Sequence, residues 1–179
     1  MTTQIFDPHH LDLRRFAETA STLTGDWPAA GFERLAADAP PAGTGTVCWS
    51  AQGEQRAVKG ATAQTWLHLQ AETTVTLICQ RCLKPMVHAV HGDRSFHFVA
   101  DEAEAERLDE ESEDDVLAMP PRGRLDLRPL IEDELILALP IVPRHDVCPE
   151  PLPMPAEDPA AAPPPHPFEA LAALKRKPN

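Results

Sequence analysis

The chain has 179 residues, enough for one modest domain with additional segments, and its net charge is −12. Only 5% of the residues are aromatic and tyrosine is absent, so a core must consist mainly of Leu, Val, Ile and Ala. The acidic balance argues against nonspecific binding to nucleic acid or to an anionic membrane. No apolar run approaches 18 residues, and the N-terminus lacks the features of a signal peptide. We therefore expect a cytoplasmic protein without a membrane span.

Two short helices are expected near the N-terminus. Pro8 suits a first helical position, and apolar residues then recur at roughly helical spacing over 8–20. A second helix is predicted over 29–38, where Phe32 and Leu35 share one side. Proline and glycine between positions 40 and 45 end this helical region.

Alternation of apolar and polar residues replaces the helical period between positions 46 and 100. This pattern predicts four strands, at 46–52, 64–71, 73–79 and 86–99. The connections between them are too short for crossover helices, so the sheet is expected to be antiparallel.

Residues 101–115 contain ten acidic side chains and one basic side chain, Arg107, and thus contribute −9 of the net charge of −12. Blocks of like charge usually form solvated loops or disordered segments, so we predict an acidic loop here. The functional alternative is a segment that mimics nucleic acid or holds a basic protein.

The strongest helical pattern covers residues 126–139. Asp126 can cap the helix, and apolar residues at steps of three and four predict a face buried against the sheet. The acidic triplet 132–134 is expected mainly on the opposite, solvent-facing side, and Pro140 ends the helix. The fold class is therefore predicted to be α+β: an antiparallel sheet of about four or more strands, packed by a C-terminal helix and short N-terminal helices.

The sequence divides into one α+β domain at 1–148, a proline-rich linker at 149–166 and a short basic tail at 167–179. Nine of the nineteen residues from Pro149 to Pro167 are proline, a composition typical of a semi-rigid linker. In the tail, three apolar residues share a helical face and a basic end follows them: Phe168, Leu171, Leu174, Lys175, Arg176 and Lys177. So short a helix is marginal in water, so the tail either docks or frays.

The sequence Cys79-Gln-Arg-Cys82 lies at the junction of two predicted strands. A thioredoxin-like redox pair needs a helix after its first cysteine, but a strand pattern follows Cys82. A structural zinc ion needs four ligands, and Cys79, Cys82, Cys148 and His145 could supply a Cys3His set. The alternative is a pair of unmetallated thiols in a turn between two strands.

Other catalytic chemistry finds little support, so no enzyme activity is expected. The sequence has no phosphate-binding glycine loop, no Gly-x-Ser-x-Gly and no His-Glu-x-x-His. Cys48 stands alone in a strand and is predicted to be a small core residue. His88, His91 and His97 are expected to decorate the face of a strand.

Three segments carry a family resemblance. They are Thr74–Pro85, which contains Cys-Gln-Arg-Cys; Asp126–Asp146, which contains Glu-Asp-Glu-Leu-Ile-Leu-Ala-Leu-Pro; and the ending 167–177. In combination they resemble the YceD family, the bacterial large ribosomal RNA subunit accumulation proteins. The resemblance implies a cytoplasmic factor without catalytic activity that is required for the synthesis, processing or stability of 23S ribosomal RNA. Some relatives carry additional C-terminal cysteines that look like zinc ligands, whereas this chain has only Cys148 there.

Two modes of action are consistent with this resemblance. In the first, the chain is an adaptor or chaperone whose acidic run holds a large-subunit ribosomal protein or a pre-ribosomal particle. In the second, the sheet face and the basic tail bind 23S ribosomal RNA directly, with stacking on Trp49 or Trp66 if these are not core residues. No small-molecule substrate is expected. The candidate partner-binding residues are Arg81, Lys84, Phe168, Leu171, Leu174, Lys175, Arg176 and Lys177.

Overall fold

The computed structural model describes residues 6–43, 45–60, 62–111 and 115–150. The chain divides into two units, Met1–Cys148 and Pro149–Asn179. Only positions 149 and 150 of the second unit are described, so the predicted linker and basic tail lie essentially outside the described residues. Among the described residues, no helix is both long and apolar enough to cross a membrane.

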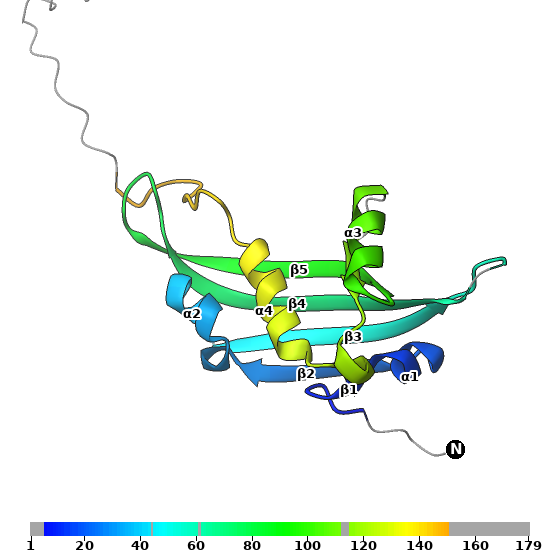
Figure 1. Cartoon of the computed structure of the whole chain (residues 1–179). Coiled ribbons are helices and arrows are strands. Elements are labelled where there is room, and N and C mark those ends of the chain that lie inside the picture. Colours follow the sequence, from blue (N-terminus) through cyan, green and yellow to red (C-terminus); the bar gives the residue numbers. More distant parts are fainter. Residues whose placement is uncertain (1–5, 44, 61, 112–114, 151–179) are drawn as a thin grey trace, which may run out of the picture. The chain divides into compact units, whose positions relative to one another are not determined.

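A five-stranded sheet forms the framework, with the strand order β2-β3-β4-β5-β6 (Figure 1). The first four strands are antiparallel: β2 (Thr22–Pro28), β3 (Thr46–Arg56), β4 (Gln64–Ile78) and β5 (Pro85–Val99). The short strand β6 (Asp115–Ala118) pairs in parallel with the end of β5. The predicted α+β class and the antiparallel pairing are confirmed, and the two strands predicted at 64–71 and 73–79 are one continuous strand, β4.

The sequence patterns missed β2 and β6. The strand β2 contains Gly25, Asp26 and Pro28, residues that weaken a strand pattern, but it is an edge strand, where glycine and proline are tolerated. Gly25 is needed there because a Cβ atom at this position would lie 2.7 Å from the Trp49 ring. The parallel pairing of β6 was not expected, because α3, a helix of ten residues, supplies a crossover in the segment that was predicted to be a loop.

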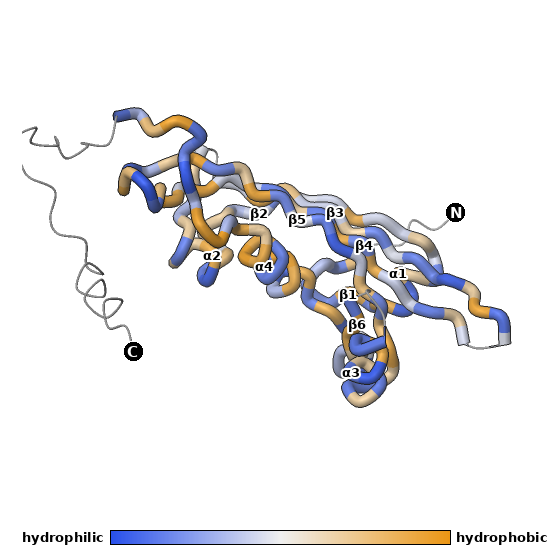
Figure 2. The backbone as a smooth tube through the Cα atoms, turned by 90° about the horizontal axis from the view of Figure 1, so that it is seen from above, coloured by the Kyte–Doolittle hydropathy of each residue, from blue (hydrophilic) through white to orange (hydrophobic). Residues whose placement is uncertain are grey.

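One face of the sheet carries the core. Along β4, the odd-numbered residues from Leu67 to Cys79 are buried, while the even-numbered residues from His68 to Ile78 are half-buried or exposed. The buried face packs against α1 (Leu13–Glu18), α2 (Glu33–Asp38) and α4 (Leu127–Leu137). Figure 2 shows α2 and α4 together on one side of the strands. The remaining elements are short: β1 (Leu11–Asp12) paired with β7 (Arg124–Leu125), and the 3-10 turns η1 (Ala29–Gly31) and η2 (Pro121–Gly123).

The N-terminal helices are shorter than predicted, because other elements occupy part of each predicted range. The region 8–20 forms the short strand β1 and then α1, which Asp12 caps by accepting a hydrogen bond from the backbone N–H of Arg15 at 3.2 Å. Gly53 on β3 allows α1 to pack closely, because a Cβ there would lie 2.6 Å from the carbonyl oxygen of Phe16. The region 29–38 yields η1 and α2.

The acidic segment predicted as a loop is instead mostly a helix, α3 (Glu102–Glu111). Asp101 accepts a hydrogen bond from the backbone N–H of Glu104 at 3.0 Å, and the Glu104 carboxylate accepts one from the N–H of Ala100 at 3.2 Å. Such reciprocal capping, with acidic residues at the positive helix end, offsets the repulsion among the charges. Ala105 and Leu108 form a small apolar side against Val99 and Val116, so the charges project from a folded element.

The helix α4 was predicted well, but the orientation predicted for its acidic triplet was wrong. Asp126 caps α4 as expected, accepting a hydrogen bond from the N–H of Arg128 at 3.0 Å. Glu132 and Glu134 are buried rather than solvent-facing, with exposed fractions of 8% and 6%. They are tolerated in the interior because each meets a guanidinium group, that of Arg34 or that of Arg94.

The Glu132 carboxylate holds α2 in place. It accepts hydrogen bonds from the backbone N–H groups of Arg34 at 2.8 Å and Leu35 at 3.2 Å, and from Nε of Arg34 at 3.0 Å. No side chain of α2 itself caps the helix. Glu132 is therefore a cap supplied from a distant part of the chain.

Glu134 plays the matching role against the sheet. Arg94 on β5 donates to Glu134 at 3.1 Å and to Asp115 on β6 at 3.2 Å, so one guanidinium group links α4 to two strands. Burial raises the pKa of Glu134, while the positive charge of Arg94 opposes that shift. Gly92 permits this packing, because a Cβ there would lie 3.3 Å from Cβ of Glu134.

We predict that Glu132→Ala lowers the free energy of unfolding by about 2–3 kcal/mol, because it leaves a buried N–H of α2 without an acceptor. The matched control is Asp133→Ala, which removes only an exposed ion pair to Arg34 and should cost less than about 1 kcal/mol. Urea unfolding followed by circular dichroism measures both. Equal losses for the two variants would refute the capping role of Glu132.

Candidate metal centre

The β4–β5 connection folds into a tight knuckle. Cys79 continues the buried face of β4 and is itself fully buried. The N–H of Cys79 donates to the carbonyl of Lys84 at 3.0 Å, and the N–H of Leu83 donates to the carbonyl of Cys79 at 2.8 Å. Leu83 adopts a left-handed conformation with φ of 58°, which lets the chain turn back into β5. The strand that follows at Pro85 agrees with the prediction that no helix activates these thiols.

The segment after α4 is fastened to this knuckle by backbone contacts. The N–H of Gln80 donates to the carbonyl of Pro143 at 2.8 Å. The guanidinium group of Arg81 donates to the carbonyls of His145 at 2.8 Å and Asp146 at 3.3 Å. These contacts bring two segments together that are more than sixty residues apart in the sequence.

The four ligands predicted from the sequence meet at this point. One ligand atom from each of Cys79, Cys82, His145 and Cys148 lies within 4.8 Å of all the others. Sγ of Cys82 and Nδ1 of His145 are 3.4 Å apart. Tetrahedral zinc with Zn–S bonds of about 2.3 Å would place its sulfur ligands about 3.8 Å apart. The cluster therefore has a donor set and a size that suit a zinc ion.

The electrostatics of the cluster favour a bound cation. Burial acts to raise the pKa of Cys79, but hydrogen bonds from the backbone N–H groups of His145, Cys82 and Arg81 outweigh it and lower the pKa to about 5. The pKa of Cys82 is raised, first by burial and then by the neighbouring sulfurs of Cys148 and Cys79. The three sulfurs thus repel one another when ionised, and a divalent cation would remove that repulsion.

Hydrogen bonds to the sulfurs complete the arrangement. Nε of Arg81 donates to Sγ of Cys148 at 3.0 Å, and the N–H of His145 donates to Sγ of Cys79 at 3.4 Å. Donors of this kind orient thiolate ligands in metal sites. Because four protein ligands would fill a tetrahedral shell, this site is suited to a structural role, clamping the β4–β5 hairpin to the chain beyond α4.

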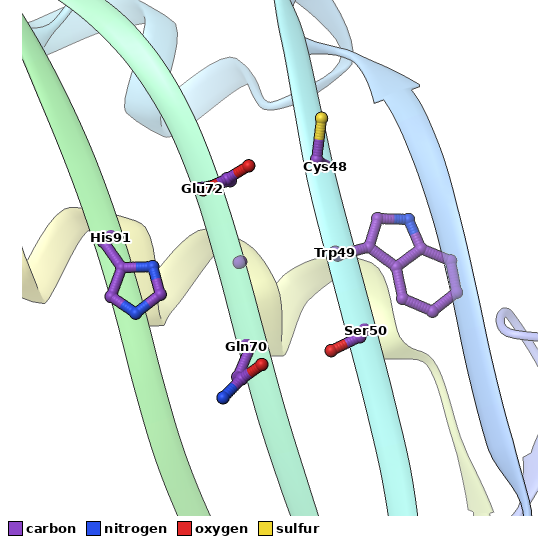
Figure 3. A pocket seen from close by; sticks show the side chains of 7 residues that line it. Cys48, Trp49, Ser50, Gln70, Glu72 and His91 are labelled. Atoms are coloured by element: carbon purple, nitrogen blue, oxygen red, sulfur yellow. The ribbon is translucent and has the colours of Figure 1, made fainter.

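A second grouping of polar residues lies on the open face of the sheet. Figure 3 shows Cys48, Ser50, Gln70, Glu72 and His91 around a hollow, with α4 behind the strands. The prediction that Cys48 is a core residue was wrong, because its position on β3 directs the side chain to this exposed face. A hydrogen bond with Asp26 is the largest cause that raises the pKa of the Cys48 thiol, which disfavours a reactive thiolate.

The other predicted site residues are distributed over the chain. Arg81 lies beside the cluster and is engaged with the 145–148 loop, while Lys84 is exposed at the knuckle. Trp49 and Trp66 are buried, with exposed fractions of 7% and 3%, as expected for core residues. The predicted contact residues of the tail lie outside the described residues. Sequence reasoning missed the contacts of Gln80 and Pro143, since they involve backbone atoms and leave no signal in residue type.

These features define a small α+β protein with a one-sided sheet and a candidate structural metal centre. Residues 67–175, more than half of the chain, match the sequence model of the family described as large ribosomal RNA subunit accumulation protein YceD. The chain belongs to this family.

One curated relative illustrates the extent of the similarity. The large ribosomal RNA subunit accumulation protein YceD of Haemophilus influenzae is 34% identical over 122 residues. The match covers 60% of this chain and 64% of the relative, so the chain spans just under two thirds of that protein's length. No solved structure matches the chain.

We predict that protein purified without chelator contains about one zinc ion per chain, and that Cys79→Ser reduces this to less than about 0.2 and lowers the melting temperature. Cys48→Ser is the matched control, because Cys48 lies on the open face and should leave both quantities unchanged. Elemental analysis and thermal unfolding provide the measurements. A parent protein with less than about 0.2 divalent ion per chain would rule out the four-ligand site.

Proposed function

We propose that this chain is a non-catalytic adaptor that promotes the accumulation of 23S ribosomal RNA by holding a basic component of the large ribosomal subunit. The observation that carries the proposal is the acidic helix α3, within a family named for large ribosomal RNA subunit accumulation. Ribosomal proteins are generally basic, and a cluster of negative charge attracts such partners over long range.

The form of α3 supports a binding role for its charges. The helix docks through Ala105 and Leu108, and most of its carboxylates remain exposed. Only one ion pair, from Arg107 to Glu111 at 3.0 Å, neutralises charge among the residues described within the helix. Carboxylates on a folded helix keep a defined spacing, so they can select a partner more sharply than a solvated loop could.

The second candidate is direct binding of 23S ribosomal RNA. The observation in its favour is the group of basic side chains at the knuckle end, Arg81, Lys84 and Arg144. Several groups that RNA would need are already occupied, which ranks this candidate below the adaptor. Trp66 lies between Arg56, 3.8 Å from its ring centre, and the stacked ring of His97. Arg94 is engaged by Glu134 and Asp115.

We predict that neutralising three exposed carboxylates of α3, in the variant Glu102→Gln/Glu106→Gln/Glu110→Gln, weakens binding of purified basic large-subunit ribosomal proteins by roughly fivefold at low salt. The capping residues Asp101 and Glu104 are left intact so that α3 still folds. Biolayer interferometry at several salt concentrations measures the affinity.

The control is Glu18→Gln/Glu33→Gln/Asp38→Asn, which removes the same three charges at exposed positions outside α3. It should retain most of the parent affinity if α3 is the binding element. Equal losses of affinity in both variants would show that the net charge of the chain, rather than α3 itself, determines binding. Tight binding of 23S ribosomal RNA fragments that is unaffected by the α3 variant would favour the second candidate.

A further inference from the structure

Most of β5 forms an open edge of the sheet. On one side β5 pairs with β4 along its whole length, but on the other side β6 pairs only with Phe96–Val99. Within the described part of the chain, no strand lies beside residues 85–95 (Figure 1). A row of unpaired backbone N–H and C=O groups along such an edge is a template for another strand.

The register identifies which backbone groups face outward. On β4, the carbonyl of Thr74 and the N–H of Thr76 bond to the chain at 40–42, on the side away from β5. The residue between them, Val75, must therefore direct its backbone groups toward β5, where its partner is His88. Even-numbered residues of β5 thus bond to β4.

Odd-numbered residues of β5 consequently present their N–H and C=O groups to the open edge. The carbonyl of Val99 confirms this parity, because it accepts a hydrogen bond from Met119 on the same side, beyond β6. The outward-facing residues beside which no strand is described are Val87, Ala89, His91 and Asp93.

The stretch 86–92 of this edge, between Pro85 and Asp93, lacks the usual protection against pairing with other chains. Residues 86–92 include no Asp, Glu, Lys or Arg, and the register with β4 runs through them without a bulge. Natural edge strands normally carry charges, bulges or proline, or are very short. Val87 is moreover 68% exposed. The seven residues 86–92 therefore depart from the usual pattern of edge strands, because they carry no Asp, Glu, Lys or Arg and contain no bulge. A partner strand bound along them would explain this departure.

The apolar surface of the molecule is concentrated at one end of this edge. Apart from Val58, every large apolar side chain that is exposed in the described residues lies within 78–87 or 137–147, the two segments that the cysteine cluster joins: Ile78, Leu83, Val87, Leu137, Ile141, Val142 and Val147. The acidic helix α3 follows the opposite end of β5. The edge therefore runs from an apolar region to an acidic one.

We propose that the β5 edge from Val87 to Asp93 binds an extended, basic segment of a partner protein as an added strand, with apolar contacts at the knuckle and ionic contacts at α3. Backbone hydrogen bonds would supply affinity and the two ends would set the direction of the segment. A second copy of this chain is the disfavoured occupant, because each copy carries a net charge of −12. This inference rests on the proposed function and specifies how the basic partner is held.

The test uses Ala89→Pro in the full-length chain. Proline removes an outward N–H that has no role in pairing with β4, and edge positions tolerate proline, so the variant should fold. The matched control Ala89→Thr changes the side chain but keeps the N–H. The probe is a synthetic octapeptide of alternating lysine and valine, compared with the same peptide carrying N-methylated valines that cannot pair as a strand.

We expect the unmodified peptide to slow hydrogen exchange of the Ala89 and His91 amides at least about tenfold at saturation. Ala89→Pro should weaken binding at least about tenfold, Ala89→Thr less than about twofold, and the N-methylated peptide should not protect these amides. Unchanged binding by a folded Ala89→Pro variant, or a parent protein whose Ala89 amide is already protected in a dimer, would overturn the inference.

The outcomes also separate this inference from the proposed function. If basic ribosomal proteins bind through α3 but bind the Ala89→Pro variant as tightly as the parent, strand addition at β5 is refuted. The proposed adaptor function is then unaffected. If the peptide adds to the β5 edge but no basic ribosomal protein binds, the adaptor function is refuted. Strand addition at β5 is then still supported.

Discussion

The antiparallel pairing of β4 with β5 is the constraint on which the rest of the structure depends. Each strand has fifteen residues, so the ribbon spans about 45 Å. Its turn is the knuckle with Cys79 and Cys82, and its far end leads into α3 and β6. The period of two along both strands puts Val75 and Leu77 into the core with Cys79 in line behind them, so the register of the hairpin also buries the first candidate metal ligand. A slip of one residue would move that thiol to the open face.

Two buried carboxylates then fix α4 on this ribbon. Glu132 supplies the cap that α2 lacks, and Glu134 meets Arg94, which also reaches Asp115. Ionic groups in a core add little net stability compared with apolar packing, but they tolerate only one arrangement of their partners. The position of α4 decides where residues 143–148 emerge, and hence whether His145 and Cys148 can reach the knuckle. The candidate metal cluster depends on these ion pairs, although none of its four residues takes part in them.

The sequence predicted the elements whose patterns are local and regular. The alternation in β3, β4 and β5 and the spacing in α4 specified the type of each element, and the Cys79–Cys82 and His145–Cys148 spacings named a candidate ligand set that the fold brings together. The errors arose where a tertiary partner overrides a local rule. Charge predicted a loop at α3, but capping by Asp101 and the contact of Ala105 with the sheet made a helix. Polarity predicted exposure for Glu132 and Glu134, but arginines from other elements allowed burial. The spacing of Asp101 and Glu104 was the signal that could have revealed α3. No sequence signal pointed to Arg34 and Arg94 as the partners of the buried carboxylates.

The knuckle and the acidic helix lie at opposite ends of the same ribbon, so under the proposed function they would contribute differently to binding. The cysteine cluster joins 78–87 to 137–147, and these two segments together carry every exposed large apolar side chain of the described residues except Val58. The charge at α3 acts over longer distances and through solvent, and is weakened by salt. A partner attracted first by α3 would be retained by short-range contacts along β5 and at the knuckle. In that order of events, a metal ion bound at the cluster would affect how long such a complex lasts, while the acidic helix would affect how fast it forms.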